Sequence, residues 1–332
     1  MADEAERLLE APAAPRRSIW ACLRPPHEIF VRLDESGWVE TASRSLSHHG
    51  LVVLRQSPQA PPLIPGSIVE RCRSAARPLL DRYLGLADRS GVADAPLQFL
   101  ELYSRAPWEN RFDLSVLRRP AHPVAASGCS ARDAYAALLG AVDRLVRPLL
   151  RASRLFGAEA AEVEAVGCVL SLPGAPSQAW HPDSEHQVGL LNVFVPLVAL
   201  SSANGPTSLE LGSHTGRRRC CRRVVNPQLA AGELVLFDWR TWHRGGANRS
   251  DAERPVAYIT YARVGVEGAS YKLTLPSLDA WESVWGGGDS GRFGGSAERN
   301  AAGGNDAVAE DGGESSDGSV WDMDGAVDVF DG

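Results

Sequence analysis

The chain has 332 residues, of which 44% are hydrophobic and 23% are charged, and its formal net charge is −7. This composition is that of an ordinary globular protein, so it excludes a collagen-like fibre, a coiled coil and a wholly disordered chain. The charge is unevenly distributed, because residues 286–332 contain 11 acidic and two basic side chains. The rest of the chain is close to neutral, and net charge alone therefore does not exclude a nucleic-acid partner.

The two ends of the chain differ in composition from the middle. Residues 1–17 are rich in Ala and Pro and are expected to form a flexible leader. Residues 286–332 are acidic and Gly-rich, so we predict a disordered tail, with a protein-binding segment as the alternative. The length between them, residues 18–285, fits a single domain.

Cysteine spacing and the N-terminal sequence bear on the cellular compartment. The six cysteines form no CxxC pair and no zinc-binding pattern, which favours free thiols in a reducing compartment. The first residues include no apolar signal segment, and no apolar stretch is long enough to span a bilayer. We therefore expect a cytoplasmic protein without a membrane span.

Two helices and one strand are predicted in the first half of the chain. The sequence GLVVLR at residues 50–55 is typical of a strand. Ser67 and Glu70 have the spacing of a capping box and predict a helix that ends near Tyr83. Apolar residues recur with helical spacing over residues 135–150, where Pro148 is expected to kink the helix or end its regular part.

Beyond residue 157 the pattern becomes that of short strands. Apolar runs separated by Gly, Pro, Ser and Asn occur at residues 165–171, 188–200, 208–211, 233–237 and 256–263. The last run alternates with period two, as a half-buried strand does. A series of such strands without intervening helices predicts an antiparallel sandwich or barrel, with the earlier helices packed outside it.

A histidine and an aspartate stand two residues apart in the segment AWHPD. In extended backbone, side chains at i and i+2 point to the same face, so His181 and Asp183 can converge on one point. A second histidine, His243, lies 60 residues beyond Asp183 and directly follows a predicted strand and turn. Two histidines and one carboxylate match the facial triad that holds ferrous iron with three positions open. The alternative is a surface histidine beside an acid.

Arg254 follows His243 by 11 residues and precedes the alternating strand. When 2-oxoglutarate chelates iron through its 2-oxo acid end, its distal carboxylate needs a partner deep in the protein. A planar guanidinium is always charged and binds carboxylates bidentately, so it suits this role better than a lysine. Alone, Arg254 would be an ordinary strand-edge arginine; together with the triad it predicts a 2-oxoglutarate site.

The order of these motifs resembles the phytanoyl-CoA dioxygenase family of non-haem iron, 2-oxoglutarate-dependent oxygenases. The resemblance runs from about residue 167 to residue 263, in the segments LSLPGAPSQAWHPD, ANGPTSLELGSHT and WHRGGANRSDAERPVAYITYAR. It implies a mainly β fold, a double-stranded β-helix or jelly roll with supporting α-helices. It also implies Fe(II), 2-oxoglutarate and O2 as cofactor, cosubstrate and oxidant.

Carried over by position, the resemblance implies the iron ligands His181, Asp183 and His243, and it implies Arg254 as the 2-oxoglutarate ligand. Asn192, Thr207 and Ser250 are further candidates for binding the cosubstrate. The chain departs from the family pattern at two positions: Leu211 stands where proline usually precedes GSH, and Gly245 stands where some members have a cosubstrate-binding serine.

The implied reaction is hydroxylation of an unactivated C–H bond of a small organic substrate, with release of succinate and CO2. Halogenating relatives lack the carboxylate ligand, so the presence of Asp183 implies hydroxylation. The family acts on acyl-CoA thioesters and other metabolites. The basic run at residues 217–223 is either a solvated loop or a binding surface for such an anionic substrate. No nucleic-acid-binding motif is present in the sequence, so no nucleic-acid partner is expected.

Four other residues are weighed separately. His214, in the segment GSHT, is expected to stabilise a turn, and His186 faces the substrate or lies in a solvated loop. Arg105 and Arg111 are candidates for the mouth of the site.

Two other functions stay open. One is a non-catalytic metal-binding or scaffold protein that uses the jelly roll and the acidic tail to bind partners. The other is a cupin-type metalloenzyme that does not use 2-oxoglutarate, although cupins usually offer more histidine ligands.

Overall fold

The fold is seen in a computed structural model, which describes residues 26–91, 96–118, 122–123, 130–156, 160–184, 186–216, 222–266, 275–278 and 280. The leader predicted at residues 1–17 and the tail predicted at residues 286–332 lie outside the described residues, as do residues 217–221 of the basic run. In the described part of the chain, no helix combines the length and apolar character needed to cross a membrane.

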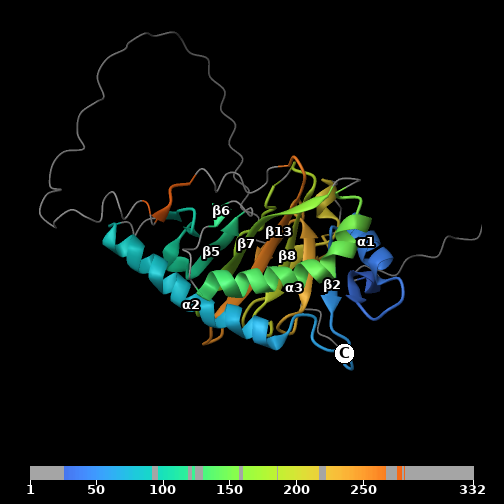
Figure 1. Cartoon of the computed structure of the whole chain (residues 1–332), viewed down its shortest axis with the longest axis horizontal. Coiled ribbons are helices and arrows are strands. Elements are labelled where there is room, and N and C mark those ends of the chain that lie inside the picture. The colour runs from blue at the N-terminus through green and yellow to red at the C-terminus, as the bar shows by residue number, and fades with distance from the viewer. Residues whose placement is uncertain are drawn as a thin grey trace, which may run out of the picture.

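The larger of two sheets has ten strands among the described residues. Strands β5, β7, β13 and β8 of this sheet lie side by side in Figure 1. Nine of them follow the order β1-β2-β11-β8-β13-β7-β5-β4-β3, and β6 pairs with β5. All neighbours are antiparallel except β1 and β2, which are parallel. The bounds are β1 Phe30–Arg32, β2 Leu51–Arg55, β3 Leu97–Gln98, β4 Leu102–Ser104, β5 Arg111–Arg118, β6 His122–Pro123, β7 Ala161–Ser171, β8 Leu190–Pro196, β11 Leu234–Asp238 and β13 Arg254–Arg263.

The second sheet has three strands in the order β10-β9-β12, with bounds β9 Thr207–Glu210, β10 Val224–Val225 and β12 His243–Gly245. An apolar core lies between the two sheets. It includes Leu51, Val53, Leu209, Val235 and Phe237. Two facing sheets with strands from one chain alternating between them form the jelly roll that the sequence predicted, and all five predicted strands beyond residue 157 are confirmed within a few residues.

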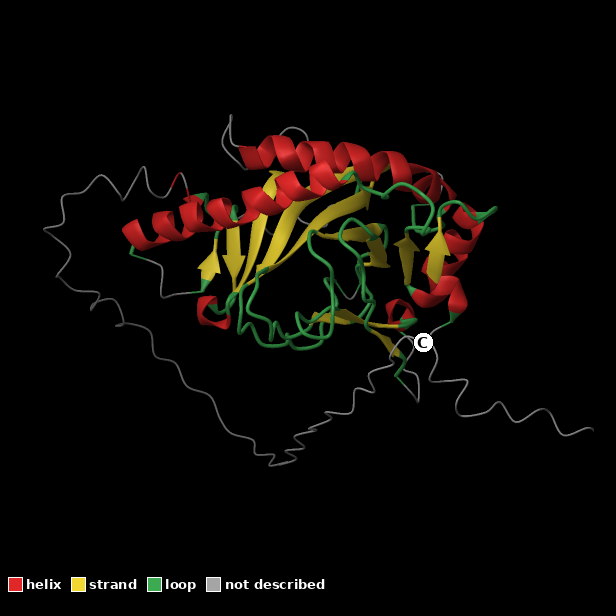
Figure 2. Cartoon of the chain, turned by 90° about the horizontal axis from the view of Figure 1, so that it is seen from below, coloured by secondary structure: helices red, strands yellow, loops and turns green. Residues whose placement is uncertain are grey.

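Three helices support the larger sheet: α1 Trp38–His49, α2 Gly66–Arg89 and α3 Ser130–Ala152. Figure 2 shows α2 and α3 lying across one face of this sheet, while the smaller sheet lies beyond the opposite face. The main core fills the space under the helices, where the buried face of α3 packs with alternate residues of β8 and β13: Tyr135, Leu138, Val142, Leu191, Val193 and Ile259. The prediction of helices outside the β structure is therefore confirmed.

Both helix predictions need correction at the ends. Ser67 does not cap α2, because the helix begins one residue earlier, after Pro65, and has no side-chain cap bond. Glu70 instead accepts hydrogen bonds from Arg73 and Ser74 on the exposed face of the helix. The helix continues to Arg89, well beyond Tyr83.

Pro148 does not end α3, which runs to Ala152. Proline removes one backbone donor, but the residues around it, Val146, Leu149 and Leu150, are buried against the sheet. Apolar burial of this size outweighs the loss of a single helical hydrogen bond.

The period-two alternation of the central strands determines what faces the space between the sheets. On β8, Leu191 and Val193 pack under the helices, so Asn192 points to the opposite face. On β13, Ala257 and Ile259 lie under the helices, and Thr260 points with Asn192, its direct cross-strand partner. The polar residues of these strands are thus brought together inside the jelly roll.

Candidate active site

A cavity of about 610 Å³ lies between the two sheets. Six of the seven residues predicted for the site line it: His181, Asp183, His243, Arg254, Asn192 and Thr207. Arg105 and Arg111 also line this cavity, as the sequence suggested. Ser250 does not line it, so its predicted role in binding the cosubstrate has no support in the geometry. Its hydroxyl instead donates to the side chain of Asn248 at 2.7 Å, within a turn.

The two histidines are positioned by a backbone bridge that joins their segments. The amide of His181 donates to the carbonyl of His243 at 3.0 Å, and the amide of His243 donates back at 2.9 Å. This reciprocal pair places the two rings 4.6 Å apart, centroid to centroid. The backbone amide of Asp183 donates to the carbonyl of Trp239 at 2.9 Å, which fixes the third residue beside them.

Hydrogen bonds to the far nitrogens fix the tautomers of both rings. Nδ1 of His181 contacts the carbonyl oxygen of Ala179 at 2.8 Å, and Nδ1 of His243 contacts that of Thr241 at 2.9 Å. A carbonyl only accepts, so in each neutral ring Nδ1 carries the proton and Nε2 keeps a free lone pair. Metal-binding histidines show this arrangement, in which the other ring nitrogen donates to a carbonyl or carboxylate.

Asp183 completes a group that can hold a metal ion. One potential ligand atom from each of His181, Asp183 and His243 lies within 4.8 Å of the other two. Oδ1 of Asp183 is 3.8 Å from Nε2 of His243. The donor set of two imidazole nitrogens and one carboxylate oxygen suits ferrous iron, and three such protein ligands would leave further coordination positions of a bound ion open.

Asn192 acts on this carboxylate. Its Nδ2 donates to Oδ2 of Asp183 at 2.6 Å, the oxygen that does not face His243. Its own oxygen accepts from Nε1 of Trp239 at 2.9 Å and from the hydroxyl of Thr260 at 2.7 Å. The amide is therefore held in one orientation, with its nitrogen toward Asp183, and Oδ1 stays available to a metal.

Burial lowers the pKa of His181, and the neighbouring His243 lowers it further. A low pKa keeps the ring neutral, which is the form that binds a metal. The ring of Phe237 lies 4.9 Å from that of His243 and closes the apolar side of the group. The lowered pKa of His181 therefore favours the neutral form of this ring.

Arg254 lies deep in the same cavity and is 2% exposed. Its Nη2 donates to the hydroxyl of Ser171 at 2.9 Å, and its Nη1 makes long contacts with the carbonyls of Asn204 and Gly246 at 3.3 and 3.4 Å. Its Nε is buried without a hydrogen-bond partner. Burial lowers the pKa of this guanidinium to about 9, and the nearby Arg111 also lowers it. A buried cation in this state is well suited to bind an anion.

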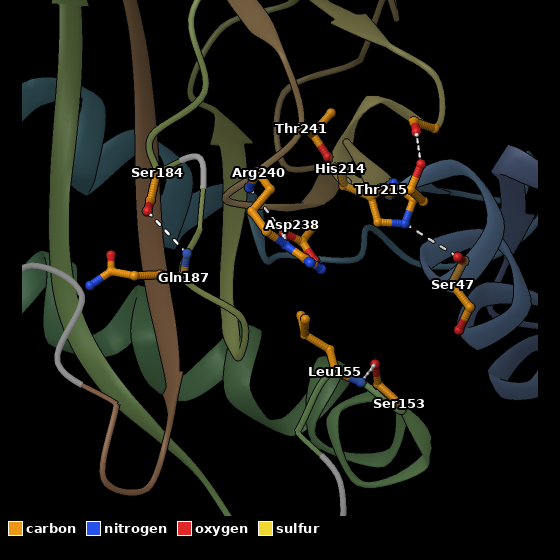
Figure 3. Close-up of polar contacts among 12 residues, drawn as sticks. Ser47, Ser153, Leu155, Ser184, Gln187, His214, Thr215, Asp238, Arg240 and Thr241 are labelled. Carbon is orange, nitrogen blue, oxygen red and sulfur yellow. Dashed lines mark hydrogen bonds and ion pairs between the residues drawn. The ribbon is translucent and has the colours of Figure 1, made fainter. Parts of the chain in front are cut away.

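His214 is a structural residue. Its Nε2 lies 3.2 Å from the carbonyl oxygen of Ser47 near the end of α1. Figure 3 marks this contact with a dashed line. The His214 ring also packs against Gly50. Gly50 has a φ of +76°, and any Cβ there would meet the His214 ring at 2.5 Å. The expected role of His214 in stabilising a turn is therefore consistent with its position, away from the metal group.

The loop after Asp183 carries His186, which is exposed and does not line the cavity. A hydrogen bond from the amide of Gln187 to the hydroxyl of Ser184 closes this loop (Figure 3). In the basic run, Arg222 forms an ion pair with Glu210 and lies over the ring of Trp180, with Arg244 also near that ring. Trp180 lines the cavity, so these arginines stand close to its rim.

Comparison with known families gives a match over the part of the chain that forms the site. Residues 141–256 match the model described as Phytanoyl-CoA dioxygenase (PhyH), and this range contains the triad and Arg254. The resemblance to the phytanoyl-CoA dioxygenase family is confirmed. The match covers about a third of the chain, from α3 to the start of β13.

Individual relatives are more distant. Dioxygenase aneA of Aspergillus aculeatus is 34% identical over 95 residues, which are 24% of this chain and 32% of the relative. The match thus spans about a third of that relative's length. Among solved structures, AviO1 from Streptomyces viridochromogenes Tue57 is 20% identical with a TM-score of 0.48, over 70% of this chain and 98% of that one. HygX from Streptomyces hygroscopicus, solved with nickel and 2-oxoglutarate, is 14% identical with a TM-score of 0.47. This similarity covers 68% of this chain and 88% of HygX.

Several residues of the cavity were missed by sequence reasoning. Trp239 and Thr260 each donate a hydrogen bond to Asn192, and Ser171 accepts one from Arg254; no motif revealed these contacts. Arg111 lies on β5, before the matched range, and its depth in the site was not predicted. The alternation along β7 could have indicated which face of the sheet Ser171 occupies. Its pairing with Arg254 depends on the register between β7 and β13, which the local sequence does not specify.

Proposed function

We propose that the protein is a non-haem Fe(II)- and 2-oxoglutarate-dependent dioxygenase that hydroxylates an unactivated C–H bond of a small organic substrate. The observation that carries the proposal is the convergence of two imidazoles with free Nε2 atoms, one oriented carboxylate and a buried arginine on a single cavity. The family match and the similarity to dioxygenase aneA support the same class.

In this proposal, His181, Asp183 and His243 hold the iron, and Arg254 holds the distal carboxylate of 2-oxoglutarate. When bound, iron with 2-oxoglutarate and O2 supplies the oxidising power, with succinate and CO2 as coproducts. The protein itself holds the side chains that would bind the iron in fixed orientations. The bridge between His181 and His243 sets the rings, and Asn192 sets the carboxylate.

The cavity volume and its polar lining support a small-molecule substrate. A volume of about 610 Å³ must hold 2-oxoglutarate and the reacting part of the substrate, and it falls within the range of ordinary ligand sites. The arginines near Trp180 at the rim suit an anionic group, such as that of a CoA thioester or another acidic metabolite.

The test is succinate formation from 2-oxoglutarate by the purified protein with Fe(II) and O2. We expect His181→Ala and His243→Ala each to abolish it, with Arg73→Gln, on the exposed face of α2, as a control that leaves it unchanged. Activity that survives both histidine changes would contradict the site. Mass spectrometry of products from a metabolite library would then show whether an oxygen atom is gained, as hydroxylation requires.

The alternatives give different outcomes in the same assay. A scaffold protein would bind metal but would form no succinate from 2-oxoglutarate, whether or not a second substrate is present. A cupin-type enzyme would not need 2-oxoglutarate, and the group of possible metal ligands found among the described residues, with two histidines, offers fewer imidazoles than that class usually has.

A further inference from the structure

The position two residues after His243 is a glycine whose side-chain space is already occupied. A Cβ placed on Gly245 would lie 2.1 Å from Nη1 of Arg111 and 2.8 Å from Oε1 of Gln178. The backbone amide of Gly245 donates to that same Oε1 at 2.9 Å. Arg111, from β5 of the other sheet, therefore reaches across the cavity into the place that a side chain on β12 would take.

Arg111 and Arg254 converge on one carbonyl oxygen. Nη2 of Arg111 donates to Gly246 at 3.0 Å, and Nη1 of Arg254 makes its longer contact with the same oxygen. The two arginines also flank one residue in the sheet, because both are cross-strand partners of Ser171. Two strands far apart in the sequence thus deliver two guanidinium groups to one point.

The donors of this pair are not used up within the described structure. Nη2 of Arg111 has a second acceptor, the carbonyl of Pro176 at 2.6 Å, but its Nη1 is buried without a hydrogen-bond partner. Nε of Arg254 is likewise buried without one. The acceptors of both residues are neutral carbonyl and hydroxyl oxygens.

The buried Arg254 and the half-buried Arg111 are both cations and repel each other at this short separation. Burial lowers the pKa of Arg111 to about 10, with the exposed Glu109 as a partly compensating neighbour. The pKa of Arg254 falls to about 9 for the reasons already given. A pair of guanidinium groups without a buried carboxylate partner gains from an anion that accepts from both.

We propose that Arg111 is a second guanidinium ligand of the distal carboxylate of the cosubstrate, and that it makes the protein select 2-oxo dicarboxylates over 2-oxo monoacids. This inference rests on the proposed function, since it assigns Arg111 to the carboxylate that Arg254 binds. In this arrangement Gly245 is required because any larger residue would push Arg111 away from the anion. The pair binds and orients the cosubstrate, and it takes no part in the chemistry at the metal.

The experiment measures binding to the nickel-loaded protein by calorimetry, with 2-oxoglutarate and with pyruvate, which lacks the distal carboxylate. For Arg111→Gln we expect the Kd of 2-oxoglutarate to rise about ten-fold or more and the Kd of pyruvate to stay as in the unmodified protein. Arg111→Lys keeps the positive charge but loses the planar guanidinium that donates two parallel hydrogen bonds. Its Kd for 2-oxoglutarate should therefore lie between that of the unmodified protein and that of Arg111→Gln. Arg73→Gln is the matched control on an exposed surface.

Gly245→Ala provides a second variant that leaves Arg111 in the sequence. Alone, it should weaken 2-oxoglutarate binding as Arg111→Gln does, because the new methyl group displaces the guanidinium. Added to Arg111→Ala, it should cost little more, because the guanidinium is then absent and only the end of the flexible Gln178 side chain has to shift. Such non-additivity is expected only if the two positions act through one contact.

The outcomes separate this inference from the proposed function. If the unmodified protein binds 2-oxoglutarate and Arg111→Gln binds it equally well, Arg111 has no role at the distal carboxylate. An equal loss for 2-oxoglutarate and pyruvate would also overturn the inference, because the effect would then lie at the 2-oxo acid end or in the fold. Failure of the unmodified, metal-loaded protein to bind 2-oxoglutarate would contradict the proposed function itself.

Discussion

Asn192 holds Asp183 through a hydrogen bond of 2.6 Å from its amide nitrogen to Oδ2. Because Trp239 and Thr260 both donate to the oxygen of the same amide, Asn192 has only one orientation that satisfies all its partners. The bond leaves Oδ1 of the carboxylate facing the histidines. The position of a candidate metal ligand is therefore set by a residue that the sequence analysis had assigned to the cosubstrate.

The first prediction concerns this residue. We expect Asn192→Ala to weaken metal binding by about 10- to 100-fold, the usual cost of losing a partner that orients a metal ligand. Asn192→Asp should weaken it at least as much, because the carboxylate would repel Asp183. Titration of the apo protein with Ni²⁺ or Co²⁺ measures both effects. Unchanged affinity in both variants would show that Asp183 is oriented by other contacts.

The second prediction concerns Arg254. Loss of a charge-assisted pair with a buried carboxylate costs about 1.5 to 3 kcal/mol, so Arg254→Met should raise the 2-oxoglutarate concentration needed for half-maximal succinate formation by about 10- to 100-fold. Metal affinity should be preserved, since no contact joins Arg254 to the triad among those described. An unchanged 2-oxoglutarate requirement would remove Arg254 from its proposed role.

The ligand types of the site could be predicted from the sequence, because they depend on local spacing. His181 and Asp183 share a face through the i, i+2 relation, and a strand precedes His243. Local spacing does not specify the register between paired strands. The pairing of Thr260 with Asn192, and of Ser171 with both Arg254 and Arg111, depends on strands that are distant in the chain.

The parts of the fold that were missed have weak local signals. Strand β5, Arg111–Arg118, alternates polar and apolar residues but follows no strong turn motif, and α1 begins after Gly37 without a side-chain cap. The prediction that Ser67 caps α2 was wrong, because the helix begins at Gly66, directly after Pro65. Glu70 therefore accepts a hydrogen bond from Arg73 instead of taking part in a cap. For β5, pairing with β7 rather than a local motif defines the strand.

A third prediction tests the core under the helices. Leu138 on α3 is fully buried, so Leu138→Ala should lower the free energy of unfolding by about 2 to 5 kcal/mol. Its neighbour Leu139 is only partly buried, and Leu139→Ala should cost clearly less. Chemical denaturation of the two variants gives the comparison. Equal losses would contradict the orientation of α3 against the sheet.

A fourth prediction concerns the two cysteines of the described structure, Cys72 and Cys168, which are free and buried. Burial raises the pKa of both thiols to about 12. Because only the thiolate reacts, both should be modified by a thiol reagent far more slowly in the folded protein than after unfolding. Mass spectrometry of digested, labelled protein measures each site. Rapid labelling of Cys168 in the folded protein would contradict its position in the core.

The central claim is that one cavity binds both ferrous iron and 2-oxoglutarate. It is tested most directly by adding Fe(II) and then 2-oxoglutarate to the protein without oxygen and recording the visible absorption spectrum. We expect a metal-to-ligand charge-transfer band that requires both additions and is absent in His243→Ala. A spectrum without this band in the unmodified protein, under conditions where Fe(II) is shown to bind, would contradict the account.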